Sequence, residues 1–118
     1  MKTIMVVDDD QDARELMATI LSDAGFAVVE CDNGRAALTQ LVGHAVLPDA
    51  IALDLAMPIM SGQELVTVLR NYVRLASVPI VVVTGVKGPV EKAFPIVGHV
   101  TKPYEPSELV QLMNDATR

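Results

Sequence analysis

Polar residues that could bind a metal ion and a phosphoryl group follow several short apolar runs of this sequence. They are Asp8 and Asp9, Asp54, Thr84 and Lys102, and they follow residues 4–7, 51–53, 80–83 and a weaker run near residue 100. If these runs are parallel strands of one sheet, their carboxyl ends share one edge, where open α/β folds bind their ligands. Three carboxylates, a hydroxyl and an ammonium group would then lie together.

The carboxylates of Asp8, Asp9 and Asp54 would repel one another at such an edge. Two unit charges about 4 Å apart interact by about 4 kcal/mol at an effective dielectric near 20. A cation relieves this repulsion, and a site made of oxygen ligands with open water positions favours Mg²⁺ over softer metals. The alternative is an acid-lined surface edge without a metal.

Lys102 and Thr84 also allow two interpretations. Most lysines are solvated surface groups, but an ammonium opposite the acids would neutralise the pocket and hold a phosphoryl oxygen. Threonine is an ordinary strand residue, so Thr84 gains significance only from its place at a strand end before Gly85. Asp10 and Asp12 stand where the first helix begins, and we interpret them as helix N-terminal acids that satisfy free amides.

The predicted helices and strands that carry these residues alternate regularly along the chain. Apolar residues recur at helical spacing in residues 13–24, 38–45, 65–76 and 109–116, and strand-like runs separate these stretches. Gly25 is a natural stop for the first helix, Phe26–Glu30 predicts a second strand, and Asn33–Gly34 predicts a turn. Five strands alternating with helices predict a single α/β domain over residues 1–118, with a parallel sheet.

The connection between Gly85 and Thr101 is rich in glycine and proline. A helix there can hardly extend beyond Pro89–Phe94, which is less than two turns at about 3.6 residues per turn. We therefore expect the fourth helix to be short.

Composition limits the class of protein. The chain has 118 residues, 51% of them hydrophobic, and a net charge of −6, which argues against unspecific nucleic-acid binding. Cys31 is the only cysteine, so no intramolecular disulfide forms, and we expect a reduced, partly buried thiol. The apolar run before Asp8 is too short for a signal peptide or a membrane span. We expect a cytoplasmic protein with no membrane partner.

Four segments, VVDDDQDARELM, ALDLAMPIMSG, VVVTG and VTKPYEPSEL, together resemble the receiver domain of bacterial response regulators in two-component signalling. The resemblance covers essentially the whole chain in the right order. It implies a flavodoxin-like, doubly wound sheet of five parallel strands in the order 2-1-3-4-5, with helices on both faces.

The resemblance also implies roles for individual residues. Asp54 matches the aspartate that accepts a phosphoryl group from a histidine kinase or a histidine phosphotransfer protein. Asp9 matches the direct Mg²⁺ ligand, and Asp8 the acid that helps through water. The main-chain oxygen of Ala56 matches a third protein ligand of Mg²⁺, in addition to Asp9 and Asp54. The remaining matches are Thr84 and Lys102 for binding the phosphoryl group, Met57, Pro58 and Gly62 for the turn after Asp54, and Pro103 for an often cis Lys-Pro bond.

Two departures from the family pattern have functional consequences. The segment from Thr84 to Lys102 is shorter than in most relatives, which affects the surface that relatives use for dimers and partners. His99 stands where relatives carry the Tyr or Phe that rotates inward on activation, so we hypothesise weak or mildly pH-dependent switching.

Ala56 and Val86 beside the site are apolar and cannot orient water, which predicts slow, unassisted autodephosphorylation.

The sequence allows other hypotheses about function. A degenerate receiver would act as a phosphorylation-independent interaction module. A Mg²⁺-dependent phosphohydrolase of the haloacid-dehalogenase type would need a second acid two residues after Asp54, where this chain has Ala56. A flavodoxin would need a hydroxyl- and glycine-rich phosphate loop after the first strand, where this chain has Asp8–Asp10. We expect a switch that catalyses only its own phosphorylation and dephosphorylation, with no output domain after the last helix and no direct contact with nucleic acid. We expect a downstream effector protein as a second partner.

Overall fold

The computed structural model describes the whole chain except residues 44–46, 55–61, 73–74, 76 and 86–95. The described strands are β1 Thr3–Val7, β2 Ala27–Cys31, β3 Ala50–Leu53, β4 Ile80–Thr84 and β5 Ile96–Thr101. The described helices are α1 Gln11–Asp23, α2 Gly34–Gly43, α3 Gly62–Arg70 and α4 Pro106–Ala116. None of these helices has the length and apolar character needed to span a membrane.

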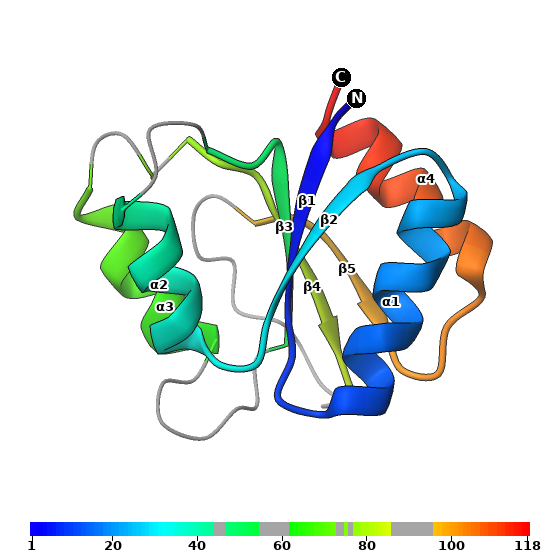
Figure 1. Ribbon diagram of the computed structural model, residues 1–118, viewed down its shortest axis with the longest axis horizontal. Coiled ribbons are helices and arrows are strands. Elements are labelled where there is room, and N and C mark those ends of the chain that lie inside the picture. Colours follow the sequence, from blue (N-terminus) through cyan, green and yellow to red (C-terminus); the bar gives the residue numbers. More distant parts are fainter. Residues whose placement is uncertain (44–46, 55–61, 73–74, 76, 86–95) are drawn as a thin grey trace.

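The strands form one parallel sheet in the order β2-β1-β3-β4-β5, which confirms the predicted order. Helices α1 and α4 cover one face of the sheet, and α2 and α3 cover the other (Figure 1). The two chain termini lie close together at the end opposite the carboxyl ends of the strands. The helix that we expect over Pro89–Phe94 lies outside the described residues.

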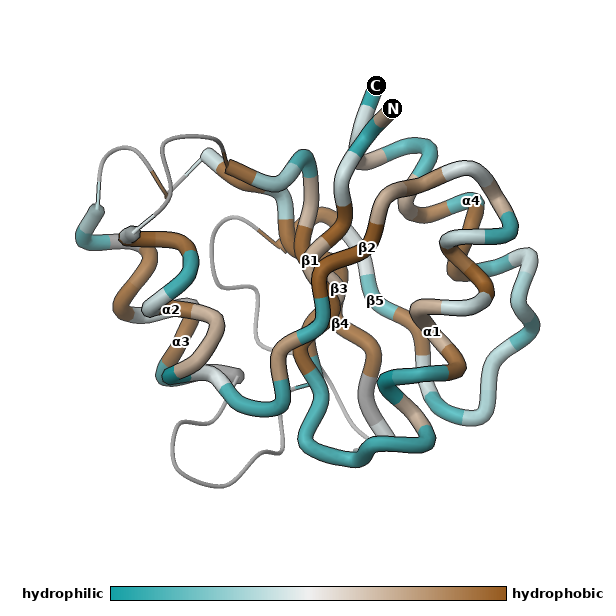
Figure 2. The backbone as a smooth tube through the Cα atoms, viewed as in Figure 1, coloured by the Kyte–Doolittle hydropathy of each residue, from teal (hydrophilic) through white to brown (hydrophobic). Residues whose placement is uncertain are grey.

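The core consists of two layers, one on each face of the sheet. Val7, Leu53 and Val82 point toward α2 and α3, and their neighbours Val6 and Val81 point toward α1 and α4. Successive strand side chains point to opposite faces, so both layers draw on the same strands. The central strands β1, β3 and β4 are accordingly predominantly hydrophobic, and hydrophilic residues gather where they end (Figure 2). In β4 the residues from Ile80 to Val83 are buried on both faces, as the apolar run of a central parallel strand requires.

The start of α1 agrees with the sequence prediction. The Asp10 side chain caps the helix by accepting a hydrogen bond from the Ala13 amide at 3.0 Å, and Asp12 lies in its first turn. Gly25, just beyond the end of the helix, has a φ of 96°, a conformation that costs glycine little. The expected stop signal is therefore confirmed.

The predicted bounds of the second strand and the predicted turn after it were wrong. The second strand begins and ends one residue later than Phe26–Glu30. Asn33 and Gly34 do not form a separate turn: Gly34 is the first residue of α2, and the side chain of Asn33 before it accepts a hydrogen bond from the Ala36 amide at 2.8 Å.

Helix α3 also ends earlier than its apolar pattern indicates. It stops at Arg70, and the amides of Asn71 and Tyr72 donate to carbonyls three residues back instead of four. These tighter bonds close the helix, and Tyr72, which belongs to the apolar pattern of residues 65–76, is 45% exposed.

Candidate functional site

The backbone of the sheet places three acids at its carboxyl edge. Val7 and Leu53 are partners in the register of β1 and β3, so Asp8 and Asp54 emerge side by side. The Asp54 amide donates to the Val7 carbonyl at 2.9 Å, and the Asp8 amide donates to the Cys31 carbonyl at 3.2 Å. Both acids are thus anchored to neighbouring strands by main-chain hydrogen bonds.

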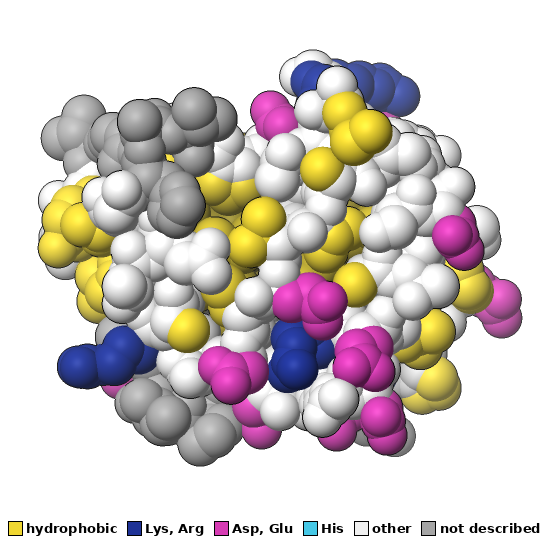
Figure 3. Space-filling model, viewed as in Figure 1, with side chains coloured by type: hydrophobic (Ala, Val, Ile, Leu, Met, Phe, Trp, Pro, Cys, Tyr) yellow, Lys and Arg dark blue, Asp and Glu magenta, His cyan; other side chains and the backbone are white. Residues whose placement is uncertain are grey.

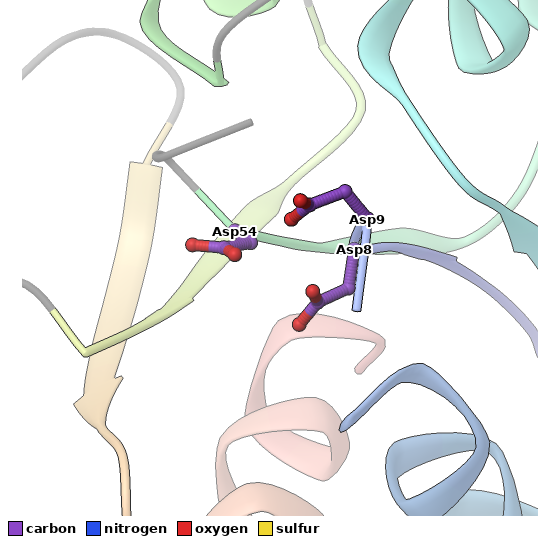
Figure 4. Close-up of side chains that lie close together, drawn as sticks. All are labelled: Asp8, Asp9 and Asp54. Carbon is purple, nitrogen blue, oxygen red and sulfur yellow. The ribbon is translucent and has the colours of Figure 1, made fainter. Parts of the chain in front are cut away.

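Carboxylate oxygens of Asp8, Asp9 and Asp54 lie within 4.8 Å of one another. Asp8 and Asp9 reach this point from the end of β1, and Asp54 reaches it from the end of β3 (Figure 4). Asp8 is fully buried and Asp54 is 7% exposed, whereas Asp9 is exposed to solvent. The site therefore has two acids in the protein interior and one that faces water.

The Lys102 ammonium lies between the two buried acids. Its Nζ is 2.6 Å from Asp8 Oδ2 and 3.7 Å from Asp54 Oδ2. The other Asp8 carboxylate oxygen, Oδ1, accepts a hydrogen bond from the Asp10 amide at 3.0 Å. Burial alone lowers the pKa of Lys102, but the hydrogen bond and charge of Asp8, with a further contribution from Asp54, outweigh burial and raise it. Lys102 thus remains a cation inside the acidic cluster.

The other predicted site residues are placed less completely. Thr84 ends β4 opposite Thr101, at the same edge as the acids, but its side chain lies outside the described part of the structure. Ala56, Met57, Pro58 and Val86 also lie outside it.

Two predictions concern residues of β5 and its end. His99 lies in β5 as expected; it is paired in register with Val82, and its side chain is exposed. The predicted cis bond between Lys102 and Pro103 is confirmed.

Arg14 is a residue near the site to which the sequence analysis gave no role. Its Nη1 donates to the Asp8 main-chain oxygen at 3.0 Å, and its Nε lies 3.3 Å from Glu30 Oε1. Long side chains in a helix lean toward the helix N-terminus. The position of Arg14 in the second turn of α1 could therefore have indicated that it reaches back to the end of β1.

The donor set fits a hard divalent cation. Three carboxylates supply only oxygen ligands, and the exposed Asp9 leaves one side open for water, as Mg²⁺ prefers. Both carboxylate oxygens of Asp8 already have partners, whereas no described residue donates to the Asp9 carboxylate. Asp9 is therefore the acid best placed for direct coordination.

A doubly wound sheet of this strand order, with an acidic cluster and a lysine at its carboxyl edge, defines a receiver-like class of α/β protein. Comparison with known proteins gives the family. Residues 4–114 match the response regulator receiver domain family, and the chain belongs to it. It is a receiver domain of the two-component response regulators.

Relatives and solved structures agree with this assignment. The chain is 35% identical to the phosphate regulon transcriptional regulatory protein PhoB of Pseudomonas aeruginosa, over 99% of this chain and 52% of PhoB. It thus spans about half the length of that relative. The chemotaxis protein CheY4 of Vibrio cholerae superposes with a TM-score of 0.88 at 29% identity, over 98% of both chains. Response regulator TrrA of Thermotoga maritima, in complex with Mg²⁺-BeF, gives a TM-score of 0.85 at 26% identity, over 98% of this chain and 99% of TrrA.

Proposed function

We propose that this protein is a phosphoacceptor switch in which Asp54 takes a phosphoryl group from a phosphohistidine of a histidine kinase or a histidine phosphotransfer protein. The observation that carries the proposal is the cluster of Asp8, Asp9 and Asp54 within 4.8 Å, with the Lys102 ammonium 3.7 Å from Asp54. A nucleophilic carboxylate, a cation-binding pair of acids and a fixed positive charge are the parts that phosphoryl transfer requires.

Asp54 is the nucleophile in this proposal, because both carboxylate oxygens of Asp8 have partners, Asp9 is best placed for the metal, and the sequence resemblance assigns the phosphoryl group to Asp54. An aspartate carboxylate is ordinarily ionised at neutral pH and needs no general base. The bond between phosphorus and the donor imidazole nitrogen breaks as the bond to an Asp54 oxygen forms, and the electron pair returns to the imidazole. Transfer of this kind depends mainly on positioning and on neutralising the phosphoryl oxygens.

Asp8, Asp9 and Asp54, with the main-chain oxygen of Ala56, would hold Mg²⁺ in this proposal. The ion, when bound, would supply positive charge to the phosphoryl oxygens. Lys102, whose ammonium lies 3.7 Å from Asp54, would supply a second positive charge, and the hydroxyl of Thr84 would bind a phosphoryl oxygen. The sequence resemblance supports the roles of Ala56 and Thr84.

The phosphorylated form acts as a signal through a shift between two conformations. New contacts of Thr84 and Lys102 with the phosphoryl group favour one of them, and His99 on the exposed side of β5 takes part in the switch. Water slowly attacks the acyl phosphate, which releases inorganic phosphate and restores Asp54. The protein has no other enzymatic activity in this proposal, and the activated form binds an effector protein.

Incubation with Mg²⁺ and acetyl phosphate tests the proposal. We expect a labile mass increase of one phosphoryl group that is absent in Asp54→Asn and in samples treated with a metal chelator. Asp12→Asn is a matched control, because Asp12 is an exposed acid of α1 outside the cluster, and it should be phosphorylated normally. An unmodified wild type, or an adduct that persists in Asp54→Asn, would contradict the proposal. The first result would favour the degenerate receiver instead.

A further inference from the structure

We infer that Arg14 is a positioning residue for the acidic site: it holds the peptide unit between Asp8 and Asp9 and so orients the Asp9 carboxylate for Mg²⁺. This inference rests on the proposed function. Arg14 does not take part in the carboxylate cluster itself. Its contact is with the Asp8 main-chain oxygen, at 3.0 Å from Nη1.

The geometry of this peptide unit explains why one hydrogen bond matters. The Asp8 carbonyl and the Asp9 amide belong to the same planar unit, so fixing the carbonyl fixes the direction in which the chain enters Asp9. Asp9 is exposed, and no described residue donates to its carboxylate, so its orientation depends on its backbone. Arg14 is thus the described side chain that restrains this peptide plane.

Glu30 completes the arrangement from the neighbouring strand. Its carboxylate lies 3.3 Å from Arg14 Nε, and the Arg14 side chain is only 16% exposed, so the guanidinium is held between β2 and the end of β1. On the face of the molecule drawn in Figure 3, acidic side chains surround a basic group near the lower ends of the strands. Glu30 also offsets a positive charge that would otherwise oppose a cation at the nearby acids.

The two effects of Arg14 on Mg²⁺ have opposite signs, which makes them separable. As a charge, the guanidinium repels Mg²⁺, so its removal would strengthen binding. As a positioning group, it orients a ligand, so its removal weakens binding. Residues that orient metal ligands typically contribute about 10- to 100-fold in metal affinity.

We expect Arg14→Ala to raise the Kd for Mg²⁺ about 10-fold, measured by NMR titration of the backbone amides. Arg14→Lys keeps the charge and one donor, so its Kd should lie between those of Arg14→Ala and the wild type. Arg118→Ala is the matched control. It removes another arginine that is paired with an acid, Asp115 at 3.1 Å, at the opposite end of the molecule, and should leave the Kd unchanged.

A second measurement needs no metal. The Asp10 amide donates to Asp8 Oδ1 at 3.0 Å, next to the peptide unit that Arg14 restrains. Hydrogen exchange of this amide should accelerate in Arg14→Ala at an unchanged global unfolding temperature. If Arg14→Ala does not fold, Glu30→Gln provides the same test, because it removes the anchor of the guanidinium at a 42% exposed side chain.

The outcomes separate this inference from the proposed function. A wild type that binds no Mg²⁺ would overturn both. A wild type that binds Mg²⁺, with Arg14→Ala binding equally or more tightly, would overturn the positioning role and leave the proposed function intact. Unchanged Asp10 exchange in a folded variant would also overturn the positioning role.

Discussion

Replacing Lys102 by methionine should destabilise the metal-free protein and at the same time strengthen its response to Mg²⁺. The ammonium is the described cation that lies between Asp8 and Asp54, at 2.6 Å and 3.7 Å. Methionine preserves much of the side-chain volume but removes the charge. The two buried carboxylates then face each other without compensation until another cation arrives.

The magnitude follows from the distances and the burial. At an effective dielectric near 20, a charge pair about 4 Å apart is worth about 4 kcal/mol, and desolvation of the ammonium offsets part of this. Removing one partner of a buried pair costs about 3–5 kcal/mol. Lys102 keeps 26% of its side chain exposed, which places the expected loss near the lower limit, at about 3 kcal/mol. For a domain of this size that corresponds to a decrease of roughly 10 °C in Tm.

Mg²⁺ should recover much of this loss because it competes with Lys102 for the same carboxylates. A ligand at 100 times its Kd stabilises a folded protein by about 2.7 kcal/mol. If Mg²⁺ binds Lys102→Met about tenfold more tightly than the wild type, it stabilises the variant by about 1.4 kcal/mol more. Thermal unfolding with and without saturating Mg²⁺ measures both quantities in one experiment.

Lys2→Met is the control for this prediction. The Lys2 ammonium donates to the Thr117 main-chain oxygen near the chain termini, away from the acidic cluster. Its replacement can lower Tm through the end of α4, but it should not change the increase in Tm caused by Mg²⁺. An equal Mg²⁺ response in the wild type and Lys102→Met would contradict this role of Lys102, and so would a variant that is as stable as the wild type without metal.

Four further predictions concern pH, the thiol, a helix cap and the core. The pKa of Lys102 is raised above its ordinary value of 10.5, so the ammonium should contribute its full stabilisation below pH 10.5. As the pH rises through the raised pKa, the difference in stability between the wild type and Lys102→Met should vanish. Chemical denaturation at several pH values measures this difference. Burial, and then the charge of Asp32, raise the pKa of the Cys31 thiol to about 11 against a smaller opposing effect of Arg14, and the residue is 4% exposed. Iodoacetamide should therefore leave Cys31 unmodified in the native protein at pH 8 and alkylate it after unfolding, as mass spectrometry would show. Asp10→Ala should cost about 1 kcal/mol in urea unfolding through loss of the cap of α1, and a neutral result would exclude that role. Leu109→Ala, at a fully buried position of α4, should cost about 2–5 kcal/mol in the same assay; a loss below 1 kcal/mol would show that the site repacks.

Much of the fold was predictable because its signals are local. The run Ile80–Val83 is apolar at every position, which indicated a central strand, and all four residues are buried on the two faces of the sheet. The cap at Asp10 and the stop at Gly25 each depend on a few neighbouring residues. The edge of the sheet at which Asp8, Asp9 and Asp54 gather followed from the rule that parallel strands end on the same side.

Helix boundaries were less predictable, because tertiary contacts compete with local pattern. The apolar spacing through Tyr72 continues that of α3, yet the helix ends at Arg70 and Tyr72 is 45% exposed. Nothing in the spacing alone distinguishes a buried stripe from apolar residues that follow a helix end. Asn33 likewise was consistent with a turn or a cap, and the hydrogen bond to the Ala36 amide decides between them.

Local patterns of the sequence are enough to predict the order of the elements and the residue types at the carboxyl edge of the sheet, because apolar spacing and acids at strand ends involve only a few neighbouring residues. Which of these groups are in contact depends on how the chain packs. Asp8 and Lys102 are 94 residues apart in sequence and 2.6 Å apart in space. In β5, a one-residue irregularity places Gly98 opposite Val81 and His99 opposite Val82, and a shift of one residue moves a side chain to the other face of the sheet. Such contacts and registers depend on packing between distant segments, which no local pattern contains.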